Sequence, residues 1–263
     1  MGHRSLSLAL QLGSVAVFLA GWQAIVLGQP HLAFFVGSPS GVAAALTQSA
    51  TLGRLPSDIG LTAFEAIIGF LIGSGAGIGV GLGLWLSRAA FDLLRPYLLF
   101  VAAVPVFALG PMFVFWFGTE LPSKVALVFV ATFSLAVMQA YQGAKSCDPN
   151  LVKLGVAFGA TRFQLLVKLI VPSAISWVLS ATRINIGMAL LGAIIGEFIS
   201  SNHGLGNLLL YAEGLYDVNL MIGCIMCIGV LALAFNGVVD IIEKSARRYL
   251  PNPAGPRRAW FED

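Results

Sequence analysis

The segment LTAFEAIIGFLIGSGAGIGVGLGLWL, residues 61–86, decides the fold class, because Glu65 is its one charged side chain. About 20 mostly apolar residues in a helix are enough to cross a bilayer. Lipid cannot satisfy the open edge of a sheet, so a segment of this kind takes a helical structure. The segment therefore predicts a membrane-spanning helix.

Five further segments on either side have the same character, and together they predict an all-α membrane protein with six transmembrane helices. Of the whole chain, 58% is hydrophobic and 10% is charged, whereas soluble domains carry about 25% charged residues. We expect a single transmembrane domain over 1–263. The first segment is long for a signal peptide and lacks a prompt small-residue cleavage pattern, so we expect it to be retained. The predicted spans are 8–27, 61–86, 97–117, 125–141, 174–198 and 219–239.

The basic residues predict the orientation. With six spans, one side of the membrane receives twelve lysines and arginines and the other receives Arg54 and Lys124. Cytoplasmic loops carry the excess of positive charge, so both termini are expected in the cytoplasm. The basic tail at 244–258 is expected to lie on the anionic inner leaflet rather than to bind nucleic acid.

The cytoplasmic loop at 142–173, QGAKSCDPNLVKLGVAFGATRFQLLVKLIVPS, is the longest on its side. Asp148-Pro149 is a helix-start signal, and Gly159 breaks the apolar run that follows. Thr161 is a second capping residue, and it begins an amphipathic segment that ends at Pro172. The pattern predicts two short helices that form a cytoplasmic knob. This knob is either a docking site for a partner protein or a structural amphipathic hairpin.

The spacing of this loop resembles a motif of permeases of binding-protein-dependent ABC importers. That motif reads Glu-Ala-Ala, three residues, Gly, nine residues, then Ile-x-Leu-Pro. Its glycine aligns with Gly159 and its proline with Pro172, while the opening triad falls on Lys153-Leu154-Gly155 and is therefore changed. Other segments resemble the nitrate/sulfonate/taurine group of the family: Phe35–Ser40, Ala103–Val106, Leu109–Pro111, Trp116–Gly118, Gly159–Phe163, Arg183-Ile184, Gly196–Phe198 and Gly204–Gly206.

The resemblance implies a bacterial inner-membrane permease with a type I ABC importer-like bundle. It implies a homodimer in the lipid bilayer, two separate ATPase subunits that use ATP and Mg, and a periplasmic binding protein. The substrate would be a nitrate-, sulfonate- or taurine-like anion or a small aromatic or pyrimidine compound. This chain would hold no cofactor and no catalytic site. The residues implied to couple it to the ATPase are Gly159, Ala160, Thr161, Arg162, Phe163, Lys168 and Pro172.

Two charged residues lie in the predicted fifth span. A charge at mid-bilayer costs about 2.5–3.5 kcal/mol on insertion scales. Arg183 is therefore either a pathway residue that meets an anionic substrate or a structural residue that snorkels or pairs with an acid. Glu197 is either a gate residue or an interfacial one. Candidates for a translocation path are Pro105, Phe107, Phe113, Trp116, Arg183 and Glu197.

Glycines and cysteines in the spans are expected to serve packing. The glycines of 69–83 include small-xxx-small pairs, Gly73/Gly77 and Gly79/Gly83, which let helices approach closely in lipid. Cys224 and Cys227 have no further ligand nearby and are expected to act as small apolar residues rather than to bind a metal. An enzyme would need clustered catalytic groups in the spans, which the sequence does not offer. A secondary transporter or channel that is not coupled to ATP is the remaining alternative.

Overall fold

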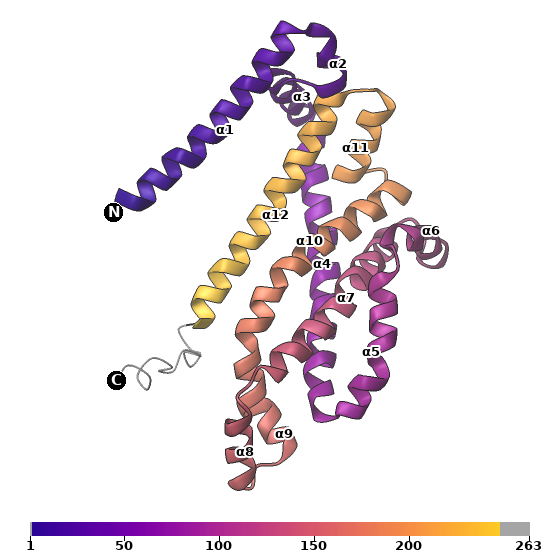
Figure 1. Cartoon of the computed structure of the whole chain (residues 1–263). Coiled ribbons are helices and arrows are strands. Elements are labelled where there is room, and N and C mark those ends of the chain that lie inside the picture. Colours follow the sequence, from indigo (N-terminus) through magenta and orange to yellow (C-terminus); the bar gives the residue numbers. More distant parts are fainter. Residues whose placement is uncertain (1, 248–263) are drawn as a thin grey trace. The chain divides into compact units, whose positions relative to one another are not determined.

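The computed structural model describes residues 2–247, and every regular element in that range is a helix (Figure 1). Of the basic tail at 244–258, the part from residue 248 onward lies outside the described residues. The elements are α1 (Gly2–Gly28), η1 (Pro30–Leu32), α2 (Ala33–Val36), α3 (Pro39–Thr51), α4 (Arg54–Gly83), η2 (Leu84–Leu86), α5 (Arg88–Ala103), α6 (Val106–Phe117), α7 (Leu121–Lys145), α8 (Pro149–Ala157), α9 (Arg162–Leu165), η3 (Leu166–Ile170), α10 (Val171–Ser200), α11 (Leu205–Gly214) and α12 (Val218–Arg247).

Four helices of the described chain are long and apolar enough to cross a membrane: α4 with η2, α7, α10 and α12. They coincide with the spans predicted at 61–86, 125–141, 174–198 and 219–239. The count reaches six when each of two bent helix pairs is taken as one span. The first pair bends by 113° between α1 and η1–α2, directly after the span predicted at 8–27.

The span predicted at 97–117 is not one continuous helix, because the chain bends there between α5 and α6 by 93°. Val104 has extended backbone angles, and Pro105 precedes the first residue of α6. A proline disfavours helical angles in the residue before it and has no N–H for the helix ladder. Pro111, by contrast, lies inside α6 without ending it. Pro105 is thus the residue that breaks this span.

The described chain forms two compact units, and the boundaries between them fall inside α4, between α10 and α11, and inside α12. Of the described residues, the larger unit holds 62–201 and 231–247, and the smaller one holds 2–61 and 202–230. The prediction of one permease domain over 1–263 stays a prediction.

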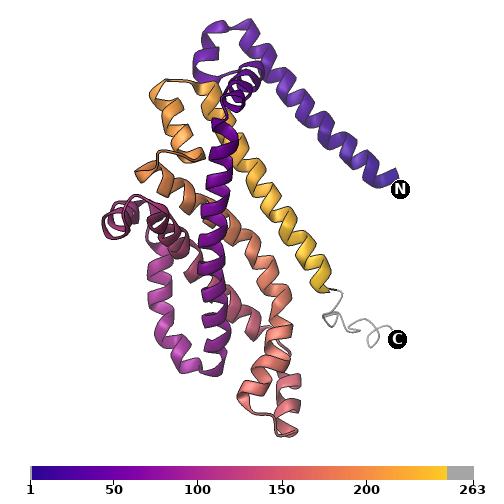
Figure 2. The ribbon, with the colours of Figure 1, turned by 180° about the vertical axis from the view of Figure 1, so that it is seen from behind.

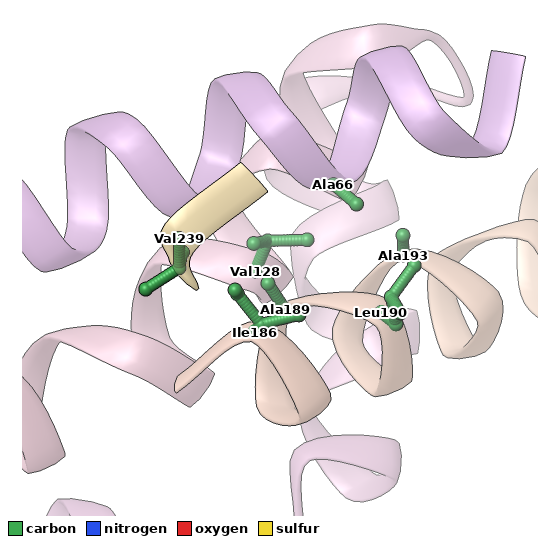
Figure 3. Packing of buried hydrophobic residues seen from close by; sticks show 7 residues of the cluster. All are labelled: Ala66, Val128, Ile186, Ala189, Leu190, Ala193 and Val239. Atoms are coloured by element: carbon green, nitrogen blue, oxygen red, sulfur yellow. The ribbon is translucent and has the colours of Figure 1, made fainter. Parts of the chain in front are cut away.

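Val128 of α7 is fully buried in an apolar cluster of the larger unit. Figure 3 shows it among small side chains of neighbouring helices, including Ala66, Ala189 and Ala193. Glycines face it from both sides: a Cβ on Gly192 would lie 2.9 Å from the Val128 Cα, and a Cβ on Gly69 would overlap the Val128 side chain. Small residues therefore let α4 and α10 approach α7 closely.

The glycines of α4 are divided between two faces. Gly69, Gly73, Gly77 and Gly81 recur every four residues, and a Cβ on any of them would collide with α7. The predicted packing role is therefore confirmed for the pair Gly73/Gly77. Gly79 and Gly83 meet no atom within 4 Å in the described chain, so the second predicted pair makes no helix contact there.

The smaller unit has its own apolar core, which joins α3, α11 and the starts of α4 and α12. Leu55, Leu205 and Leu208 are buried there together with Cys224, which packs as a small apolar side chain as predicted. The Ser38 hydroxyl accepts a hydrogen bond from the Gly41 N–H at 3.0 Å and so caps α3.

Polar contacts fix the start of α11 and the start of α4 within the smaller unit. The buried Asp58 carboxylate accepts a hydrogen bond from the Gly204 N–H at 2.9 Å. Arg54 pairs with Asp58 at 3.4 Å, donates to the Asn207 side chain at 3.1 Å and lies 4.5 Å from the centre of the Tyr211 ring. These contacts order the segments that the orientation prediction places outside the cell.

Candidate functional site

The first short helix of the loop, α8, begins and ends where the sequence predicts. The Asp148 carboxylate accepts a hydrogen bond from the Asn150 N–H at 2.8 Å. Gly159 has a φ of +78°, and its N–H bonds to the Val156 carbonyl at 2.9 Å, while the Ala160 N–H bonds to the Gly155 carbonyl at 3.0 Å. These two bonds form a Schellman motif, which needs a left-handed residue that glycine supplies without strain.

The second short helix, α9, begins directly after this turn. The Gln164 N–H bonds to the Thr161 hydroxyl at 3.2 Å, and the Thr161 N–H bonds to the Gln164 side-chain oxygen at 2.8 Å. This reciprocal pair is a capping box, which satisfies N–H groups that a helix start leaves free. Two consecutive capping motifs therefore hold the knob, residues 148–165, in one conformation.

The single amphipathic helix predicted from Thr161 to Pro172 is wrong in its second half. Only Arg162–Leu165 are α-helical, and η3 continues them as one π turn that leads into α10 without a break. Pro172 lies in the first turn of α10 and does not end a helix. A proline ring collides with the carbonyl four residues before it in a regular α-helix, which explains the wider turn directly before Pro172.

The knob exposes apolar surface around a groove of about 540 Å³. Phe158 is 82% exposed and Phe163 is 67% exposed. Leu154, Gly159 and Lys168 are among the residues that line the groove. Soluble surfaces rarely leave such side chains uncovered together, and an apolar patch with a charged rim is typical of a protein-binding site.

Arg162 also ties the knob to another part of the same unit. Its guanidinium donates a hydrogen bond to the Leu86 carbonyl at 3.3 Å, at the end of η2. Figures 1 and 2 show α8 and α9 at the same end of the unit as the turn between α4 and α5. The predicted coupling residues Gly159, Ala160, Thr161, Arg162, Phe163, Lys168 and Pro172 thus lie in one continuous segment. Their contact with an ATPase stays a prediction.

A buried polar cluster joins α4, α7 and α10, and the sequence analysis missed it. The Lys124 ammonium lies 2.9 Å from the Glu65 carboxylate and donates to the Ser201 hydroxyl at 3.0 Å. The Thr62 hydroxyl donates to the Glu197 carboxylate at 2.6 Å, and the side chains of Glu65 and Glu197 also interact. Glu65 is 1% exposed, Glu197 is 0% exposed and Lys124 is 5% exposed.

Glu197 is thus buried within the protein, and Lys124 lies in α7 rather than in a loop. Whether Glu197 is a gate residue or an interfacial one stays a prediction. Buried charges are tolerated when they are paired and hydrogen-bonded. The lysine stem reaches the cluster because Gly196 has no side chain: a Cβ there would lie 2.9 Å from the Lys124 Cγ. Pro122, in the first turn of α7, was the available signal, because a proline at a helix start places Lys124 inside the helix rather than before it.

Arg183 pairs with two acidic residues of α12. This agrees with the alternative in which Arg183 is a structural residue paired with an acid. Its guanidinium lies 2.6 Å from the Asp240 carboxylate and 2.7 Å from the Glu243 carboxylate. Glu243 is nearly buried, whereas Arg183 and Asp240 are half exposed. The charge of Arg183 is thus compensated within the chain.

Replacing Arg183 by glutamine is expected to destabilise the protein by about 1–3 kcal/mol, because it leaves the buried Glu243 carboxylate without its charged partner. Thermal unfolding in detergent measures this. The control is Arg88→Gln, which removes an exposed pair of 3.7 Å and should cost no more than about 1 kcal/mol. Equal melting temperatures for the two variants would contradict the assignment.

The aromatic candidates for a translocation path lie on α6, after the break at Pro105. Phe107 and Trp116 are more than half exposed in the single chain. Phe113 packs against Trp116 with ring centres 5.7 Å apart. Their role in a path stays a prediction, as do those of Arg183 and Glu197.

The comparison with protein families assigns the chain. A family model described as "Binding-protein-dependent transport system inner membrane component" matches residues 69–248, which is more than half of the chain. The chain belongs to this family. It is an inner-membrane permease and the transmembrane subunit of an ATP-driven importer. This identification selects the importer over the secondary transporter or channel that remained as an alternative.

Named relatives agree with this assignment over most of the permease. It is 31% identical to the riboflavin transport system permease protein RibX of Chloroflexus aurantiacus, over 90% of this chain and 88% of that protein. It is 32% identical to the formylaminopyrimidine transport permease protein ThiX of Halalkalibacterium halodurans, over 69% of this chain and 71% of that protein.

A solved structure shows the same fold. The permease superimposes with a TM-score of 0.68 on a chain of the MetNI methionine ABC transporter in an inward-facing conformation. The match covers 75% of this chain and 98% of that chain at 15% sequence identity. The predicted type I importer-like helical bundle is confirmed by this likeness.

Proposed function

We propose that two copies of this permease form the translocation path, and that one ATPase subunit docks on the knob of each copy. ATP and Mg bind to those ATPases, and this chain holds neither a cofactor nor a catalytic site. A binding protein delivers the solute from the outer side. The permease then alternates between inward-facing and outward-facing states as the ATPases close and open.

The observation that carries this proposal is the construction of the knob. The Schellman motif and the capping box fix residues 148–165, and the groove beside Phe158 offers apolar surface to a partner. Through η3 the knob continues into α10, which also holds Arg183 and Glu197. A displacement of the knob by an ATPase therefore acts directly on a membrane-spanning helix.

The smaller unit is the proposed docking surface for the binding protein. The orientation predicted from the basic residues places α3 and α11 on the outer side. The substrate is proposed to be a small solute, either a sulfonate-, nitrate- or taurine-like anion or a small aromatic or pyrimidine compound. The relatives named for riboflavin and formylaminopyrimidine support the aromatic class, and the resemblance to the sulfonate group supports the anionic class.

Replacing Gly159 by valine tests the knob. A β-branched residue is strained at a φ of +78°, and the left-handed conformation costs about 1–2 kcal/mol even for ordinary residues. We expect ATP-dependent uptake into proteoliposomes, with ATPase and binding protein present, to fall about tenfold, since about 1.4 kcal/mol corresponds to a factor of ten. Co-purification of the ATPase should weaken in parallel.

The matched control is Gly53→Val, which places the same strain at a φ of +71° in the smaller unit. A Cβ on Gly53, like one on Gly159, would meet no atom within 4 Å. The control should keep the ATPase bound in co-purification. Full uptake by the Gly159 variant, or uptake by the native protein without ATP, would refute the proposed coupling.

A further inference from the structure

A second, smaller pocket opens between α5 and α7, away from the groove of the knob. Its volume is about 290 Å³, and it is lined by Arg88, Phe91, Asp92, Arg95, Tyr141 and Lys145, among others. Arg88 begins α5 and Lys145 ends α7. The pocket thus lies at the end of the unit that carries the knob, which is the cytoplasmic end by the distribution of basic residues.

The pocket has an excess of positive charge. Three of the side chains that line it are basic, and Asp92 is the acidic one. Asp92 pairs with Arg88 at 3.7 Å. Neither Arg95 nor Lys145 has a carboxylate within ion-pair distance among residues 2–247, and the Lys145 ammonium lies 5.8 Å from the centre of the Tyr141 ring. Two cations therefore face the pocket uncompensated.

The floor of the pocket and the helix beyond it are apolar. The rings of Phe91 and Tyr141 stack with centres 3.5 Å apart. Farther along the same face of α5, one turn after Arg95, Leu99 is half exposed. A ligand that fills both regions needs an anionic head and an apolar tail.

We propose that this pocket binds the phosphodiester headgroup of an anionic phospholipid from the cytoplasmic leaflet. Arg95 and Lys145 contact the phosphate, and the acyl chains run along α5 past Leu99. Basic pockets between membrane helices on the cytoplasmic side commonly take such headgroups. A bound lipid joins α5 to α7, the helix that leads into the knob, and so stabilises that end of the unit.

The test uses the full chain in a neutral detergent with phosphatidylglycerol, phosphatidylcholine or glycerol 3-phosphate added. Phosphatidylglycerol should raise the melting temperature and appear as a bound adduct in native mass spectrometry, whereas phosphatidylcholine should do neither. In the double variant Arg95→Gln/Lys145→Gln, the affinity for phosphatidylglycerol should fall about tenfold or more, because each basic group near an anionic lipid contributes separately.

Two controls separate the site from general charge effects. Lys153→Gln/Lys168→Gln removes two exposed basic residues of the loop and should leave lipid binding unchanged. Arg95→Lys/Lys145→Arg keeps both charges and should also bind, which shows that lost binding in the glutamine variant is not a folding defect.

Three results would overturn the proposal. One is equal binding of phosphatidylcholine, and another is equal stabilisation by glycerol 3-phosphate, which would indicate a soluble phosphate ligand. The third is displacement of the lipid by the ATPase subunit, which would make the pocket part of a protein interface. Retained lipid binding in the presence of the ATPase supports the site and leaves the coupling proposal as a separate question.

Discussion

Replacing Lys124 by methionine is expected to destabilise the protein by about 3–5 kcal/mol, which is the cost of removing one partner of a buried ion pair. Methionine keeps the length and apolar stem of the side chain, so packing against Gly196 should persist. The change leaves the almost fully buried Glu65 carboxylate without its charged partner. Burial keeps water from replacing that partner, and this is the reason for the size of the effect.

Thermal unfolding and the yield of monodisperse protein in detergent measure this prediction. The control is Lys153→Met, which removes an exposed lysine and should behave like the native protein. The double variant Glu65→Gln/Lys124→Met should recover part of the loss, because a neutral amide needs no counter-charge. If the double variant is less stable than Lys124→Met alone, the ion pair is not the source of the effect.

The second large effect is expected from adding one methyl group to α4 at Gly77. A Cβ there would lie 2.6 Å from the Phe133 carbonyl oxygen and 2.6 Å from the Ala136 Cβ. Backbone cannot move aside as a flexible side chain does, so α4 and α7 must separate. Overpacking of this kind costs about 1–3 kcal/mol, and the cost grows when lost helix contacts are not replaced.

Gly79→Ala is the matched control, since it lies on the same helix and its Cβ would meet nothing within 4 Å. Alanine favours helix over glycine by about 1 kcal/mol, so this variant should be as stable as the native protein or more so. Opposite shifts in melting temperature for Gly77→Ala and Gly79→Ala are the expected result. Equal shifts would show that α4 does not pack on α7 as described.

The membrane spans were predictable from the sequence where a long apolar segment is sufficient by itself to form a membrane helix. The segments 61–86, 125–141, 174–198 and 219–239 each became one helix, because hydropathy alone determines such a structure in lipid. The segment 97–117 has the same apolar character, yet it breaks at Pro105. Proline within a membrane helix can either be accommodated or end the helix, and the choice depends on neighbouring helices that a single segment does not reveal.

The candidate site was predictable where short-range chemistry determines it. Asp148, Gly159 and Thr161 are capping residues, and each took the role that its local sequence indicates. The buried cluster was not predictable in this way, because Lys124 lies 59 residues from Glu65 along the chain. A contact of that kind depends on how helices pack, which sequence periodicity does not reveal.

The π turn at residues 166–170 sets the rotational phase between the two parts of the chain that it joins. A π turn holds one residue more than an α turn, and each residue of an α-helix turns the chain by about 100°. If this segment were a regular α-helix, the groove beside Phe158 would be rotated by about 100° around the helix axis relative to Arg183. The one extra residue before Pro172 thus determines the direction in which a partner bound to the knob would have to displace it to move α10.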